Sequence, residues 1–176
     1  MNKVVLLFTF IWAQLLPSNT CAQEHLKVMD IPIDGNVSSF IEKVKSRGFD
    51  NPQFFDENNV WLTGGTFLDM PACMLLGCTP KSKTVAVVIV IVKGFETNDS
   101  IDFYKKLVLE VYKEKYGEYD ETYNSNEGVN YVFQGQGGMI SVFTKPLSQG
   151  AMSGISIRYS DSINCKKFFS EYSDDI

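Results

Sequence analysis

Hydrophobic residues recur with the period of an α-helix in two segments of the chain. A helix is predicted over 36–48, where four apolar residues have the spacing i, i+3, i+4, i+7 of one helix face. These residues are Val37, Phe40, Ile41 and Val44. Asn36 can cap the start of this helix, and Gly48 can end it in the left-handed conformation. A second helix is predicted from about Asn98 to Gly117, with an apolar face of the same kind.

Six runs with the composition and period of β-strands follow the two helices, three after each helix. They cover 60–67, 72–79 and 84–92 in the first half, and 129–134, 139–144 and 154–160 in the second. The loop Gly135–Gly138 predicts a hairpin between two of the later runs, because glycine adopts positive φ without steric cost.

One offset relates the two halves. Gly48 and Gly117, which end the two helices, are 69 residues apart, and the same offset aligns later strands. The pattern predicts repeats at about 28–95 and 96–162, followed by a tail over 163–176 with a partial helix around 164–170. We therefore expect an α+β domain in which two α-β-β-β units form one mainly antiparallel six-stranded sheet, with two helices on one face.

The run Val85–Val92 is apolar at eight consecutive positions. It is too short to cross a membrane as a helix, and its β-branched residues favour a strand. A strand in a half-exposed sheet should alternate apolar and polar residues, so both faces of this strand must be covered. The cover is either the chain itself, through its N-terminal segment or sheet curvature, or a partner, a second copy or an apolar ligand. Val88 and Val90 mark the possible interaction face.

The first 22 residues have the pattern of a secretory signal. Lys3 precedes the apolar run Val4–Leu16, and small residues lead to a predicted cleavage between Ala22 and Gln23. The run is too short for a membrane-spanning helix, so no membrane-spanning segment is expected after signal removal.

Lipidation at Cys21 is the alternative use of this leader. Lipoprotein signals normally have Leu three residues before the cysteine and Gly, Ala or Ser directly before it. Ser18 and Thr20 stand at those positions here, which favours simple cleavage. The protein is therefore expected to be secreted or periplasmic.

Residues 23–176 have the size and charge of a single soluble domain. Without residues 1–22 the chain retains 15 basic and 21 acidic residues, a formal charge of −6. Neither nucleic acid nor an anionic lipid surface is an expected partner, because both require clustered Lys and Arg.

Three cysteines remain after signal removal, which is an odd number for a disulfide framework. Cys73 and Cys78 are five residues apart on one predicted strand, too far apart for a bridge. Cys165 could pair with either of them, or all three could be buried free thiols.

Four short segments of the chain look like parts of an uncharacterised family of small secreted proteins from gut Bacteroidetes. They are Val28–Gly35, Ser46–Phe49, Thr79–Val85 and Ile157–Asn164. The resemblance supplies no catalytic residues. At the level of fold, the doubled α-β-β-β plan is similar to that of β-lactamase inhibitor protein and of the outer-membrane assembly lipoprotein fold, which are binding modules.

The resemblance also implies two modification sites. Asp99-Ser100-Ile101 and Asp161-Ser162-Ile163 match the O-glycosylation pattern of exported proteins from that bacterial group. Ser100 and Ser162 are the acceptor residues that the pattern implies.

The residues offer little for catalysis. His25 is the only histidine and lies near a predicted mobile N-terminus, so a histidine-assisted serine or cysteine nucleophile is not expected. One His and three scattered Cys are a poor set of metal ligands. Gly135–Gly138 lacks the pattern of a nucleotide-binding loop, so no cofactor is expected.

The sequence therefore predicts an exported, non-catalytic binding module whose partner is a protein or another envelope component. One alternative is an inhibitor of an exported enzyme, for which Gly135–Gly138 would have to project as a hairpin loop. A further alternative is a hydrolase that uses paired carboxylates, which would require two acids to face each other across a pocket.

Overall fold

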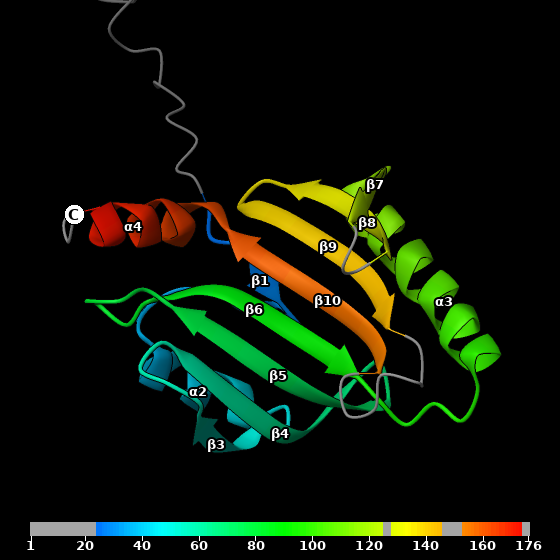
Figure 1. Ribbon diagram of the computed structural model, residues 1–176, viewed down its shortest axis with the longest axis horizontal. Coiled ribbons are helices and arrows are strands. Elements are labelled where there is room, and N and C mark those ends of the chain that lie inside the picture. The colour runs from blue at the N-terminus through cyan, green and yellow to red at the C-terminus, as the bar shows by residue number, and fades with distance from the viewer. Residues whose placement is uncertain (1–23, 125–127, 146–152, 174–176) are drawn as a thin grey trace, which may run out of the picture.

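The computed structural model describes residues 24–124, 128–145 and 153–173, which form an α+β fold (Figure 1). The first half of the chain contains β1 (Lys27–Val28), β2 (Ile31–Pro32), α2 (Val37–Lys45), β3 (Asp50–Phe54), β4 (Asn59–Phe67), β5 (Met70–Cys78) and β6 (Val85–Val92). The second half contains α3 (Asn98–Tyr116), β7 (Asp120–Asn124), β8 (Gly128–Gly135), β9 (Gly138–Lys145), β10 (Gly154–Asp161) and α4 (Ser162–Ser173).

One antiparallel sheet of eight strands dominates the fold, with the order β3-β4-β5-β6-β10-β9-β8-β7. β1 and β2 form a separate two-stranded hairpin. Each half of the chain supplies one helix followed by four strands, and the last strands of the two halves, β6 and β10, pair at the centre. The doubled arrangement thus differs in detail from the prediction.

The prediction of six strands is wrong because β3 and β7, the two outer strands, do not have an apolar pattern. All five residues of β3 are exposed, and they include Pro52. β7 begins with Asp120 and Glu121, which are also exposed. Such strands cover no core, so apolar periodicity cannot reveal them.

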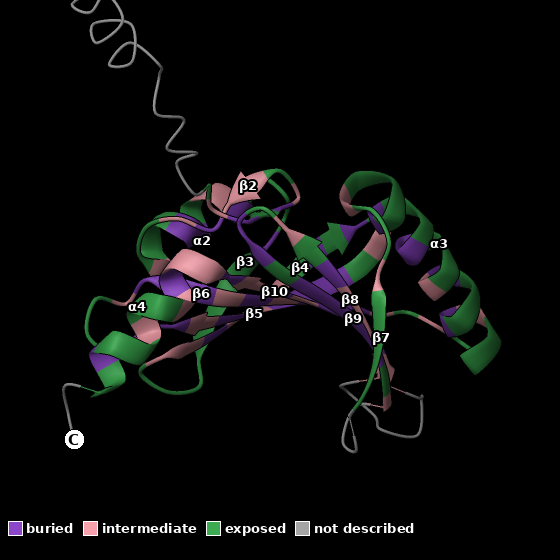
Figure 2. Ribbon diagram, turned by 90° about the horizontal axis from the view of Figure 1, so that it is seen from above, coloured by how far each residue is buried: buried purple, intermediate pink, exposed green. Residues whose placement is uncertain are grey.

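α2 and α3 cover one side of the sheet, which we call the core face (Figure 2). Phe40 and Val44 of α2 and Val108 of α3 are completely buried in the same cluster as the core-face residues of the central strands. Asn36 caps α2, since its side chain accepts a hydrogen bond from the amide of Ser39. The cap of α3 is Thr97, one residue before the predicted start.

β6 is buried on both sides to different degrees. Val88 and Val90, which the sequence analysis assigned to a possible interaction face, are 0% exposed and lie in the core beneath the helices. Val87 and Ile89 point to the opposite side and are half-buried. The assignment of the interaction face must therefore be corrected to that side, because alternation along a strand defines two faces but not which one the helices cover.

The predicted mobility of His25 is wrong. Its Nδ1 lies 3.2 Å from both carboxylate oxygens of Asp161, which is completely buried. The same carboxylate accepts hydrogen bonds from the amides of Leu26 (2.8 Å) and Asn164 (2.9 Å). This contact spans 136 residues, so no local pattern could predict it.

The glycine-rich loop forms the predicted hairpin between β8 and β9, but it does not project. A Cβ atom at Gly137 would lie 2.3 Å from the amide nitrogen of Leu26, so only glycine fits beneath the N-terminal segment. No helix within the described ranges is long and apolar enough to span a membrane.

The division between the two sides of the sheet can be tested at two adjacent residues of β5. Leu76 is 0% exposed in the core, whereas Leu75 is half-buried on the other side. We expect Leu76→Ala to lower the free energy of unfolding by about 2–5 kcal/mol, because it leaves a cavity in a packed core. Leu75→Ala should cost about 1 kcal/mol. Urea unfolding measures both changes, and equal losses would contradict the assignment of the faces.

Candidate functional site

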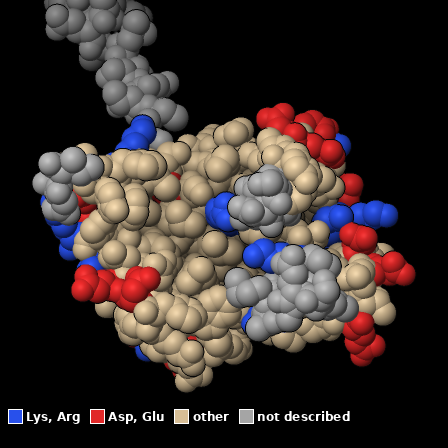
Figure 3. All heavy atoms as spheres, in the orientation of Figure 1, with Lys and Arg blue, Asp and Glu red and all other residues tan. Residues whose placement is uncertain are grey.

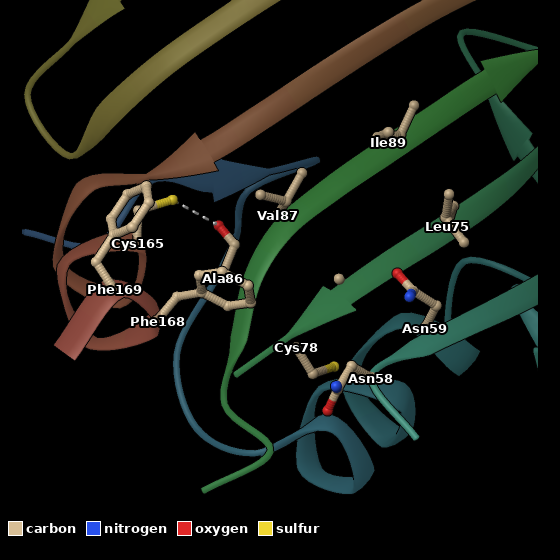
Figure 4. A pocket seen from close by; sticks show the side chains of 11 residues that line it. Asn58, Asn59, Leu75, Cys78, Ala86, Val87, Ile89, Cys165, Phe168 and Phe169 are labelled. Carbon is tan, nitrogen blue, oxygen red and sulfur yellow. Dashed lines mark hydrogen bonds between the residues drawn. The ribbon is translucent and has the colours of Figure 1, made fainter. Parts of the chain in front are cut away.

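A groove of about 440 Å³ lies on the side of the sheet opposite α2 and α3, between the sheet and α4 (Figure 4). We call this side of the sheet the groove face. The lining residues come from the β3–β4 turn, the strands β4, β5 and β6, and the helix α4; they are Asn58, Asn59, Leu75, Gly77, Cys78, Ala86, Val87, Ile89, Cys165, Phe168 and Phe169.

α4 is held over the groove at both of its ends. At its start, Asp161 accepts the amide of Asn164, and the Asn164 side chain donates to the carbonyl oxygens of Ile33 and Val85 (2.8 Å each). Near its end, the Glu171 carboxylate accepts the amides of Lys81 (2.8 Å) and Ser82 (3.1 Å) in the β5–β6 loop. The helix is therefore a fixed wall of the groove.

The floor and the α4 wall of the groove are apolar. Leu75, Val87 and Ile89 come from neighbouring strands and form the floor, as Figure 4 shows. Gly77 keeps the floor low, since a Cβ atom there would meet nothing closer than 3.6 Å. Phe168 and Phe169 line the groove from α4, and Phe169 is 72% exposed.

Polar groups reach only the rim of the groove. The Asn58 side-chain oxygen accepts a hydrogen bond from Lys83 Nζ at 2.9 Å. The Asn59 amide donates to both oxygens of Asp56, at 3.0 and 2.8 Å. None of the described residues that line the groove is charged. Figure 3 shows uncharged atoms over much of this side of the molecule, with some basic groups near its middle and acidic groups near its margin.

Two thiols line the groove, and neither is an activated nucleophile. Burial raises the pKa of Cys78 from its ordinary 9.0 to about 11. Burial also raises the pKa of Cys165, and its Sγ lies 3.6 Å from the carbonyl oxygen of Ala86. Cys73, Cys78 and Cys165 are all free, so the sequence alternative of a bridge to Cys165 is not formed in this structure. Protonated thiols fit an apolar wall rather than covalent chemistry.

The other residues singled out in the sequence lie away from the groove lining or outside the described residues. The Ser100 hydroxyl belongs to the capping box of α3, where it donates to the carbonyl oxygen of Thr97 at 2.7 Å. Ser162 is the first residue of α4 and is half-buried. Glycosylation of either serine stays a prediction. Cys21, Ala22 and Gln23 lie outside the described residues.

The described part of the chain contains no group of three or more His, Cys, Asp and Glu side chains that could hold a metal ion. The functional residues that the sequence analysis missed are those of α4, which was expected to be only a partial helix. The signal was available: Phe168, Phe169 and Tyr172 are apolar residues at helical spacing in the tail. In the structure Phe168 stacks on Tyr172 with ring centroids 6.0 Å apart.

The attachment of α4 should weaken in acid. Hydrogen bonds from the Ser82 hydroxyl and from the Ser82 and Lys81 amides lower the pKa of Glu171 to about 2. A depressed pKa means that this stabilisation is complete above the ordinary pKa of 4.5 and is lost as the pH falls toward 2. The protection factors of the α4 amides, which compare their hydrogen-exchange rates with those of the unfolded chain at the same pH, should therefore fall across that window. Glu171→Gln should give lower protection factors at pH 7, and these should no longer change between pH 4.5 and 2; a profile identical to that of the unaltered protein would contradict the attachment.

Alkylation tests the state of the groove thiols. With a pKa of about 11, Cys78 is ionised at pH 8 about 100-fold less than an ordinary thiol with a pKa of 9.0. We expect iodoacetamide to modify Cys78 at least that much more slowly in the folded protein than in urea, as followed by peptide mass spectrometry. Half-buried Cys165 should react at an intermediate rate. Equal rates for Cys78 in the two states would contradict its burial.

Comparisons with protein-family models, with curated proteins and with solved structures find no match to this chain. The resemblance to small secreted Bacteroidetes proteins and to the β-lactamase inhibitor protein fold therefore stays a prediction.

Proposed function

We propose that the protein is an exported, non-catalytic binding module that holds the hydrocarbon chain of a free single-chain amphiphile, such as a fatty acid, in the groove beneath α4. The observation that carries this proposal is the groove itself, which is apolar and free of charged lining residues among those described. Its volume of about 440 Å³ lies within the usual range of small-molecule sites.

A hydrocarbon chain fits this groove better than a peptide does. The floor strands β5 and β6 each pair with a neighbour on both sides, so their backbone groups are already hydrogen-bonded within the sheet. A peptide would bury its own amides against this floor without partners, which is costly. A hydrocarbon chain has no such requirement, and each buried methylene contributes about 0.8 kcal/mol.

The rim of the groove can bind a polar head group at one end of the hydrocarbon chain. Asn58 lines the groove and holds Lys83 Nζ at 2.9 Å, which brings a positive charge to its edge. A carboxylate head could reach this ammonium group while its chain lies along Leu75, Val87 and Ile89. We therefore expect a fatty acid to bind more tightly than the uncharged alcohol of the same length.

Trp61 gives a direct signal for the binding experiment. It is the only tryptophan outside the leader, and it pairs with Leu75 of the groove floor across β4 and β5. In the protein that spans residues 23–176, dodecanoate, decanoate and octanoate should change the fluorescence of Trp61. The affinity should rise about fourfold for each added methylene. Dodecanol should bind more weakly than dodecanoate, and phospholipid vesicles should give no change, because the proposal is for a free amphiphile.

Gly77→Leu is the matched structural test. The site has room for a side chain and Gly77 does not have positive φ, so the variant should fold and fill the groove. We expect at least a tenfold loss of dodecanoate affinity, with a smaller loss for Gly77→Ala. Tyr123→Ser, at a 79% exposed position on β7, is the control and should bind normally. Dodecanoate binding that is absent, independent of chain length or unchanged in a folded Gly77→Leu protein would refute the proposal.

A further inference from the structure

A second cleft, of about 610 Å³, lies on the side of the sheet that α2 and α3 cover. It shares no lining residue with the groove. It is bordered by the β1–β2 hairpin, the end of α2, the β4–β5 turn and the last turns of α3. In Figure 2 the hairpin lies between α2 and α3. We call it the tyrosine cleft after Tyr112 and Tyr159, which are among its lining residues.

These two tyrosines form a buried polar pair. Tyr159 is 1% exposed and Tyr112 is 6% exposed, and their hydroxyl groups hydrogen-bond to each other. Burial raises the pKa of both hydroxyls, so both carry their protons at neutral pH. One proton lies between the two oxygens. Among the described residues the second proton has no acceptor, although a buried hydroxyl donor normally finds one.

The rim carries charges of both signs. Lys27, Arg47 and Lys115 supply donors, and Asp30 and Asp69 supply acceptors. Lys115 Nζ lies 3.1 Å from Asp30, and Arg47 Nη2 donates to the carbonyl oxygen of Met29 at 3.3 Å, which leaves further donors on the guanidinium.

The C-terminal ends of α2 and α3 also contribute to the charge balance of the cleft. α2 ends next to the lining residues Ser46 and Arg47, and α3 ends at Tyr116, which also lines the cleft. Both helices therefore direct their C-terminal ends, which carry partial negative charge, toward the cleft. This partial charge offsets the excess of cations over acids, so the cleft favours neither an anion nor a cation.

The walls combine this polar rim with apolar and aromatic surface. Met29 and Leu68 come from two tight turns, Phe67 is the last residue of β4, and Tyr116 comes from α3. Its ring lies 5.6 Å from that of Tyr112. Such walls can contact the C–H faces of a ring while the rim and floor bond its polar substituents.

Both turns hold their backbones in an unfavourable conformation. Met29 and Asp30 have φ of 49° and 67°, and Leu68 and Asp69 have φ of 45° and 65°. Positive φ is disfavoured for bulky residues such as Met and Leu. The Tyr104 hydroxyl reaches the carbonyl oxygens of Phe67 (2.9 Å) and Leu68 (2.8 Å), which fixes the second turn at the cleft. Strain held by the surrounding structure is common at binding sites.

We propose that the tyrosine cleft binds a neutral carbohydrate of one or two rings. Sugar hydroxyls both donate and accept, which matches a rim with ammonium, guanidinium and carboxylate groups in near balance. One acceptor oxygen of the sugar would take the unmatched tyrosine proton at the floor. The apolar faces of the ring would lie against the wall of Met29, Phe67 and Tyr116.

The test is saturation-transfer NMR of residues 23–176 with glucose, galactose, mannose, N-acetylglucosamine, maltose, cellobiose and lactose. Sodium benzoate serves as a probe for an anionic ring ligand. We expect at least one sugar to bind and benzoate to bind more weakly. Binding of benzoate alone, or of no sugar in this panel, would overturn the proposal.

Two variants link binding to the cleft. The double variant Tyr112→Phe/Tyr159→Phe removes both hydroxyls while keeping the ring shapes, so it should fold and bind the sugar about threefold to tenfold more weakly. Asp69→Asn keeps a residue that tolerates positive φ but removes an acceptor charge, and it should also weaken binding. Tyr123→Phe is the exposed control. Sugar affinity unchanged in both cleft variants would refute the assignment.

This proposal is independent of the hydrocarbon groove. Gly77→Leu fills the groove and should leave sugar binding unaltered, and the double tyrosine variant should bind dodecanoate normally. Failure of one proposal is therefore distinguishable from failure of the other.

Discussion

The pairing of β6 with β10 is the constraint on which the rest of the structure depends. These strands end the two halves of the chain, and they pair in register from Ile155 opposite Val92 to Ser160 opposite Val87. Because this ladder joins two four-stranded halves, it makes one sheet and allows α2 and α3 to share one core. Loss of this pairing would leave two smaller sheets, each with its apolar core face half covered.

The two sides of the sheet differ because α4 is added to only one of the two units. Each unit has one helix on the core face, the short α2 in the first unit and the long α3 in the second. After β10 the chain continues as α4 and turns back over β6 on the groove face. Asp161 holds both α4 and the N-terminal segment in place. Its carboxylate binds the first turn of α4 and the N-terminal segment at His25 and Leu26. A single buried acid thus connects the beginning of the described chain with its final helix.

Much of the fold could be predicted from apolar periodicity, including the helical spacing of Phe168, Phe169 and Tyr172 in α4, whereas the tertiary contacts that form the two sites could not. The two predicted helices and the six apolar strands correspond to elements of the structure, because each of them buries a face. β3 and β7 bury almost nothing and were missed. The choice between Val87 and Val88 as the outward residue depends on where distant helices pack, and alternation alone is blind to that. The Tyr112–Tyr159 pair and the His25–Asp161 contact join residues 47 and 136 positions apart, so only the tertiary structure reveals them.

The two outer strands have a consequence for how copies of this protein behave together. An exposed sheet edge can recruit a strand from another molecule, and an eight-stranded antiparallel sheet offers two such edges. Pro52 removes one backbone donor from β3, while Asp120 and Glu121 bring negative charge to β7. The missing donor and the negative charges therefore disfavour the addition of a strand from another copy at either edge of the sheet.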